Sequence, residues 1–170
     1  MLEQANPGTI IDLHTDSSNR FMFMFFCLRA YIDGFLSLIR PVIAIDGMFL
    51  KGPHRGVLFV AMCMDGNDQI FPLAFGVGDL ETNEAWEWFL TRLHTAVGEV
   101  NDLVIVSNKK DSIMAGVKKV FPNSFHVACA VRLEQNMVGH YGRNKALKQY
   151  FRRAAKVHRE SQFLQCMEEL

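Results

Sequence analysis

The sequence has few cysteines and no pattern among them. The four are Cys27, Cys63, Cys129 and Cys166, and no C-x-x-C pair occurs. Their spacing excludes a zinc ribbon and gives no disulfide framework. The chain also lacks a positively charged start followed by an apolar run, so we expect no secretion signal and a reducing compartment inside the cell.

An uninterrupted apolar stretch of membrane-spanning length is missing as well. The nearest approach is FMFMFFCLRAYIDGFLSLI, residues 21–39. Arg29, Asp33 and Gly34 interrupt this segment, and each charge at the centre of a bilayer costs roughly 3 kcal/mol. We therefore expect no contact with a membrane.

Net charge is absent too, because 18 basic residues balance 18 acidic ones. The basic residues nevertheless gather in one segment, where seven Lys or Arg face one acid between Tyr141 and Glu160. Such a cluster favours a nucleic-acid-binding surface, although a solvated helix face explains it equally well. The candidates for DNA contact are Arg143, Lys145, Lys148, Arg152, Arg153 and Lys156.

What is present is the composition of a globular protein. Hydrophobic residues make up 49% of the 170 positions and charged residues 21%, far from the composition of a disordered chain. We expect an N-terminal hairpin and helix over residues 1–40, a core domain over 41–140 and a basic helical segment over 141–170.

Hydrophobic periodicity predicts an α/β fold. Residues 8–28 have the pattern of a hairpin and residues 29–39 that of a short helix ending before Pro41. The next three strands are PVIAID, GVLFVAMCMD and QIFPLAFGVG, and their short connections allow only antiparallel neighbours. A helix follows, with Trp86, Phe89 and Leu93 on one stripe. After it come the strand LVIVS, the helix SIMAGVKKVF and the strand SFHVACAV. The rest of the chain has the pattern of two helical pieces, split near Gly139 and Gly142.

This order predicts a mixed five-stranded sheet with flanking helices. A strand entered after a crossover helix lies parallel to the strand it joins, so LVIVS is expected beside PVIAID. The ends of these two strands would then bring Asp46 close to Asn108. Two carboxylates at such an edge, joined by a third, could hold divalent metal ions, whereas Asp46-Gly47 alone is more often a simple turn.

The same segments resemble the transposase domain of plant Mutator-like elements (MULE). The run RPVIAIDGMFLKGPHRGVLFVAMCMDG and the later run LVIVSNKKDSIMAGVKKVFPNSFHVACAVRLEQN carry the likeness, which extends from about Asn6 to the C-terminus. It implies a ribonuclease-H-like fold, a DDE triad of acids and DNA cleavage and strand transfer with Mg²⁺ or Mn²⁺. It further implies a DNA partner rather than a small-molecule substrate, and a nuclear location, with the cytoplasm as the alternative for a fragment.

Transferred position by position, the triad is incomplete. The first acid falls on Asp46, the second position is Asn108, and the third, a glutamate, would lie beyond Leu170. Met48-Phe49 stands where the family commonly has Thr-His. Cys129 is followed by Arg132 where the family has Cys-x-x-His, so we expect Cys129 to be a packed thiol rather than a metal ligand with His126.

Two further acids are weaker candidates for the catalytic site. Asp111 could substitute for the missing second acid, but its place at the start of a helix favours capping of that helix. Glu81 precedes the helix over 83–97 and could approach the same edge, although a favourable charge near that helix N-terminus explains it as well.

The hypothesis that follows is a partial or decayed MULE transposase domain without DNA cleavage and without productively bound metal. The alternative is a domesticated DNA-binding module, like the plant far-red-response transcription regulators that resemble these transposases. A third alternative is one fragment of a longer reading frame that supplies the glutamate. Oligomeric state stays open.

Overall fold

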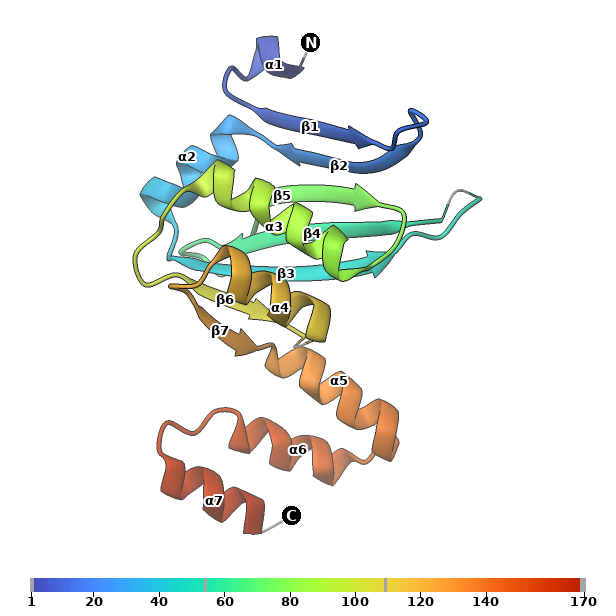
Figure 1. The fold of residues 1–170 in the computed structure, drawn as a ribbon. Coiled ribbons are helices and arrows are strands. Elements are labelled where there is room, and N and C mark those ends of the chain that lie inside the picture. The colour runs from blue at the N-terminus through green and yellow to red at the C-terminus, as the bar shows by residue number, and fades with distance from the viewer. Residues whose placement is uncertain (1, 54, 109, 169–170) are drawn as a thin grey trace. The chain divides into compact units, whose positions relative to one another are not determined.

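The computed structural model describes residues 2–53, 55–108 and 110–168 and divides into two compact units, which meet at Val127 and Ala128. Figure 1 gives the order of the elements along the chain. The larger unit is built on one sheet, whose strands run in the order β1-β2-β5-β4-β3-β6-β7. Their bounds are β1 Ile10–Thr15, β2 Phe21–Cys27, β3 Val42–Phe49, β4 Val57–Met64, β5 Ile70–Gly78, β6 Val104–Ser107 and β7 Phe125–Ala128.

The expectation of five strands is wrong, because the sheet has seven. The N-terminal hairpin is confirmed, with β1 and β2 antiparallel. It does not stand apart, since β2 pairs antiparallel with the outer edge of β5 from Phe23–Gly78 to Phe26–Phe75. This pairing satisfies the backbone groups of an edge that would otherwise be open, and it buries Phe25 and Cys27.

The central part of the sheet confirms the predicted strand directions. Strands β3, β4 and β5 form an antiparallel meander. Strand β6 lies parallel to β3, in a register that pairs Val42 with Val104, Ile43 with Ile105 and Ala44 with Val106. The parallel pairing of β3 with β6 is confirmed, but the predicted end of the first strand at Asp46 is wrong, because β3 continues beside β4 to Phe49.

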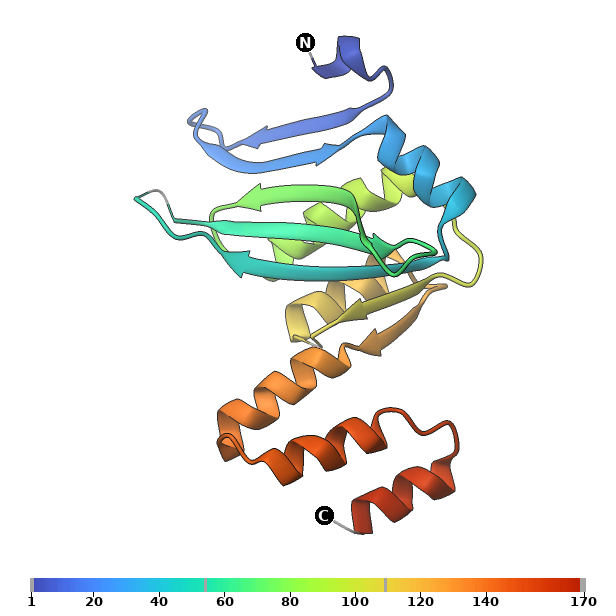
Figure 2. The ribbon, with the colours of Figure 1, turned by 180° about the vertical axis from the view of Figure 1, so that it is seen from behind.

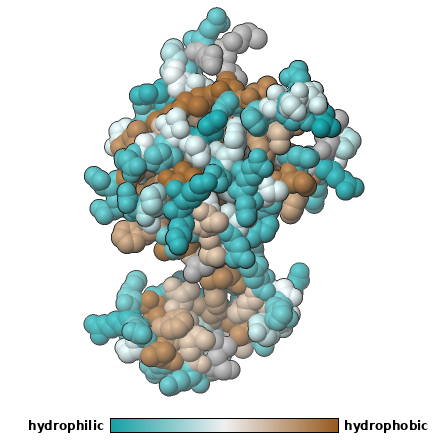
Figure 3. Space-filling view, in the orientation of Figure 1, coloured by the Kyte–Doolittle hydropathy of each residue, from teal (hydrophilic) through white to brown (hydrophobic). Residues whose placement is uncertain are grey.

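Helices α2 (Arg29–Leu38), α3 (Asn83–Val97) and α4 (Asp111–Val120) belong to the larger unit, and α1 (Leu2–Ala5) is a single turn. Helix α3 begins where the Thr82 hydroxyl accepts the N–H of Ala85 at 3.1 Å, and its apolar stripe carries Trp86, Phe89 and Leu93. Figures 1 and 2 show α3 and α4 on one face of the sheet. The surface on that side mixes hydrophilic residues with small hydrophobic patches (Figure 3).

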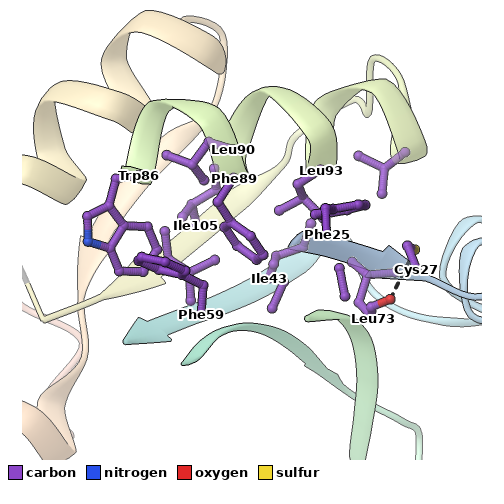
Figure 4. Close-up of a cluster of buried hydrophobic side chains, with 14 of the residues drawn as sticks. Phe25, Cys27, Ile43, Phe59, Leu73, Trp86, Phe89, Leu90, Leu93 and Ile105 are labelled. Carbon is purple, nitrogen blue, oxygen red and sulfur yellow. Dashed lines mark hydrogen bonds between the residues drawn. The ribbon is translucent and has the colours of Figure 1, made fainter. Parts of the chain in front are cut away.

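The core lies between α3 and the sheet. Figure 4 shows Phe89 of α3 among side chains of three strands, with Phe59 and Phe25 on either side and Ile43 beneath. Ring centroids of Phe59 and Trp86 are 4.9 Å apart in an edge-to-face arrangement. The aromatic side chains thus fix the position of α3 over the centre of the sheet.

Residues 21–39, which have the length of a membrane span, divide into strand β2 and helix α2. Across the described residues, the structure contains no helix with both the length and the apolar character to span a bilayer. Helix α2 instead packs Ile32 and Phe35 into the core.

The smaller unit contains three helices rather than the two expected pieces. They are α5 Ala130–Tyr141, α6 Lys145–Ala154 and α7 Glu160–Glu168. The break after Tyr141 was predicted, and there the side chain of Asn144 caps α6 by accepting the N–H of Ala146 at 3.0 Å. The break after Ala154 was missed, since tight i→i+3 hydrogen bonds end α6 without a glycine or proline.

Candidate active site

Asp46 lies within β3, three residues before its last residue Phe49, and Asn108 directly follows β6. The last paired residues of β3 and β6 are Ala44 and Val106, so two residues further along each strand the same register sets Asp46 level with Asn108. Side chains that are level in parallel strands share one face of the sheet. Both residues are half-buried.

The side-chain position of Gly47 faces α3, on the other side of the sheet from Asp46. A Cβ atom at this position would lie 3.1 Å from Cζ2 of Trp86 and 3.3 Å from Oε1 of Glu81. Because successive side chains of a strand alternate between faces, Asp46 projects from the face opposite Glu81. Glu81 is thus close to the backbone next to Asp46, but on the helix side of the sheet.

The carboxylate of Glu81 already has two partners. Lys110 donates from Nζ at 2.5 Å, and Trp86 donates from Nε1 at 3.2 Å. The Glu81 side chain is only 5% exposed, while that of Lys110 is 48% exposed. The ammonium of Lys110 therefore balances the buried carboxylate of Glu81, because a buried charge without a partner costs much free energy.

Asn108 shapes the turn between β6 and α4. Its Oδ1 accepts the backbone N–H of Lys110 at 3.1 Å. An aspartate oxygen could accept the same bond, so the turn itself does not require an amide. The amide changes the charge at this edge and keeps the local backbone.

Asp111 is not the cap that was expected. It is the first residue of α4, whereas the capping position belongs to Lys110, whose own side chain makes no cap hydrogen bond. The exposed carboxylate of Asp111 instead lies in the first turn, where the helix dipole favours a negative charge.

A buried pair beside Asn108 was not found from the sequence. Ser107 Oγ lies 2.8 Å from Nε2 of His126, and Ser107 is 1% exposed. The pair links the end of β6 to β7, and nothing in the spacing of the two residues signals it. Cys129, which was expected to be packed in the core, is only half-buried at the start of α5.

These residues do not fit a centre for two divalent metal ions. Asp46 supplies one carboxylate, Asn108 supplies a neutral amide, and Glu81 is paired on the other face. Within residues 2–53, 55–108 and 110–168, no three His, Cys, Asp or Glu side chains come together as a metal-binding group. Mg²⁺ in proteins relies on carboxylates and phosphates for its negative charge, and this edge offers one such group.

The predicted DNA-binding residues divide into two sets. Lys148 and Arg152 both pair with Glu134 of α5, at 2.8 Å from Nζ and 2.6 Å from Nε. Their hydrogen bonds hold the pKa of Glu134 at about 2. Arg143, Lys145, Arg153 and Lys156 lie exposed on the smaller unit, as Arg152 does, and Arg153 also has an interaction partner.

Comparison with protein families matches residues 42–136 to the MULE transposase domain. The matched segment starts at the first residue of β3 and includes Asp46, Glu81 and Asn108. No match is found among curated proteins. Since the match covers more than half of the 170 residues, the chain belongs to the MULE transposase domain family.

Proposed function

We propose that this protein is a MULE-type transposase domain that engages DNA in the nucleus but does not cleave it. The observation that carries the proposal is the amide of Asn108 directly after β6, level in the register with Asp46 of β3. Transposases of this family are generally metal-dependent, so the charge at this edge decides whether the site can act.

The order of five strands supports a ribonuclease-H-like core. Strands β5-β4-β3-β6-β7 combine an antiparallel meander with a parallel neighbour of β3. In this interpretation β1 and β2 are an addition to the outer edge of β5. The candidate site then lies at the C-terminal end of β6, beside β3, and the C-terminal ends of strands are the usual position for chemistry in an open α/β sheet.

The chemical reason for the proposed inactivity is too little negative charge to hold two metal ions. Two-metal cleavage of a phosphodiester needs both ions held about 3.5–4 Å apart, where they repel each other strongly. Carboxylates offset that repulsion, whereas an amide oxygen coordinates a metal ion without adding negative charge. Asp46 alone is insufficient for such a pair of ions.

Nicking of supercoiled plasmid tests the proposal directly. The purified protein and its Asp46→Ala variant should show the same low level of nicking with about 5 mM Mg²⁺ or Mn²⁺. This concentration is well above the usual dissociation constant of a functional site. Nicking by the protein that disappears in the Asp46→Ala variant would contradict the proposal.

A second candidate function is a DNA-binding regulatory module derived from a transposase. The exposed residues Arg143, Lys145 and Lys156 favour it, because phosphate contacts need no catalytic metal. Duplex binding should then weaken steeply with salt, and removal of one contacting lysine, as in Lys145→Ala, should reduce the slope of log K against log salt by about one. A flat salt dependence, or no retention on DNA at about 50 mM salt, would count against this function.

A further inference from the structure

An aromatic ring stands exposed at the end of β3, close to the candidate site. Phe49 is 70% exposed, although it is the last residue of a strand that buries Ile43 and Ile45. Its backbone is held in the sheet by pairing with Val57 of β4. The turn that follows projects past the ends of the neighbouring strands (Figures 1 and 2).

One cation lies near this ring, and two more line the groove beside it. The ammonium of Lys110 lies 6.0 Å from the ring centroid of Phe49. Beside the ring runs an open groove of about 500 Å³, lined by Phe49, Leu50, Lys51, Arg55, Asp79 and Leu80 among others. Asp79 and the Glu81 partner of Lys110 offset part of the positive charge, and Lys51 and Arg55 are exposed cations that line the groove.

We propose that Phe49, Lys51 and Arg55 form a contact surface for unpaired nucleic acid, with one base stacked on the Phe49 ring and phosphates on the two cations. Every base has a flat π-face, so an exposed aromatic ring binds bases without sequence preference, and neighbouring cations follow the backbone. In an intact duplex the faces of the bases are covered by their neighbours. The ring can therefore be used only by a single strand, a gap or a frayed end.

The position of this surface relative to Asp46 follows from β3. Phe49 lies three residues beyond Asp46 on β3, about 10 Å along the strand, and by the alternation of side chains it lies on the helix face with Gly47, opposite Asp46. Nucleic acid on the ring therefore contacts the helix face, which also carries Glu81 and Lys110. This inference rests on the proposed function for its nucleic-acid partner, but it concerns a different contact and needs no metal.

Fluorescence anisotropy with two labelled probes tests the surface, namely a single-stranded oligothymidine and a mixed-sequence duplex of equal length at about 50 mM salt. Phe49→Leu should weaken single-strand binding about fivefold or more and change duplex binding much less. Phe49→Tyr keeps a ring and should retain the affinity. Lys51→Ala and Arg55→Ala should each reduce the salt slope for the single strand by about 0.7.

Two matched controls come from the same unit. Phe125→Leu changes another exposed aromatic, 63% exposed on β7, and Lys118→Ala changes an exposed lysine of α4. Both should bind the single strand as the unmodified protein does. Equal single-strand binding by Phe49→Leu, an equal loss in Phe125→Leu, or no single-strand binding by the unmodified protein would overturn the inference, while retained duplex binding in those cases would leave the proposed function standing.

Discussion

Asn108 differs from aspartate by an amide nitrogen in place of one oxygen, and the surrounding structure accepts either group. Its Oδ1 bond to the N–H of Lys110 serves the turn in both cases. Lys110 in turn neutralises Glu81, on the face opposite Asp46. The Glu81 carboxylate is therefore balanced by Lys110 on the helix face, and Asp46 contributes a carboxylate to the opposite face.

Among single residues, two of the cysteines should react very slowly with alkylating agents. Burial raises the pKa of the Cys27 and Cys63 thiols to about 12, and Cys27 donates its S–H to the carbonyl of Leu73 at 3.1 Å. Only the thiolate reacts with alkylating agents. With iodoacetamide at pH 8, the half-buried Cys129 should be labelled long before Cys27 and Cys63, as followed by peptide mass spectrometry.

Unfolding in guanidinium supplies the control for this prediction, because all four thiols should then be labelled at similar rates. Labelling of Cys27 or Cys63 in the folded protein at the rate of Cys129 would show that these strands open far more readily than their burial indicates.

At the scale of elements, α3 approaches β5 so closely that one position has no room for a side chain. A Cβ atom on Gly76 would lie 2.7 Å from Cδ2 of Phe89 and 3.3 Å from the carbonyl oxygen of Met24. Phe89 is fully buried between other rings and cannot move aside. Gly76→Ala should lower the free energy of unfolding by about 1–3 kcal/mol.

Thermal or urea unfolding followed by circular dichroism measures this change. Gly139→Ala is the matched comparison, since nothing lies within 4 Å of the added Cβ atom in α5. There, alanine should be neutral or stabilising by up to about 1 kcal/mol. An unchanged midpoint for Gly76→Ala would mean that α3 lies further from the sheet than described.

The contact between α5 and α6 should depend on pH through Glu134. Hydrogen bonds from Arg152 and Lys148 lower the pKa of this carboxyl group from 4.5 to about 2 in the folded state. Its contribution to stability is therefore present above about pH 4.5 and is lost as the pH falls toward 2. The midpoint difference between the unmodified protein and Glu134→Gln should be largest near neutral pH and vanish near pH 2.

Unfolding midpoints measured from pH 7 to pH 2 check this expectation at low salt, where exposed ion pairs are least screened. Glu160→Gln, at the exposed start of α7, serves as the control within the same unit. A midpoint difference for Glu134→Gln that is independent of pH would show that the carboxylate is not engaged by its two partners.

At the scale of the whole molecule, local patterns predicted more than long-range contacts did. Strand directions from β3 to β6 followed from the short turns and the crossover helix, and these placed Asp46 and Asn108 at one edge. The two strands of the N-terminal hairpin were predicted, but their addition to the sheet was missed, because the pairing of β2 with β5 joins segments about 50 residues apart and no local signal reports it.

In the candidate site, too, the contacts between distant segments could not be predicted from the sequence. The side of the sheet on which Glu81 lies depends on the alternation around Gly47, and the commitment of Lys148 and Arg152 to Glu134 depends on how α5 meets α6. Residue types and spacing carry neither fact. They do carry the loss of charge at position 108, because that loss is a property of one residue.

The central claim is that a transposase-family domain keeps its strand ends in place and lacks the charge for a metal centre. A Mn²⁺ titration of the Asn108→Asp variant tests it, with Asp46→Ala/Asn108→Asp as control. We predict that Asn108→Asp binds Mn²⁺ at least about tenfold more tightly than the unmodified protein, and that the control loses this gain, since each carboxylate near the ion contributes its charge. An unchanged titration, or a gain that persists without Asp46, would contradict the claim.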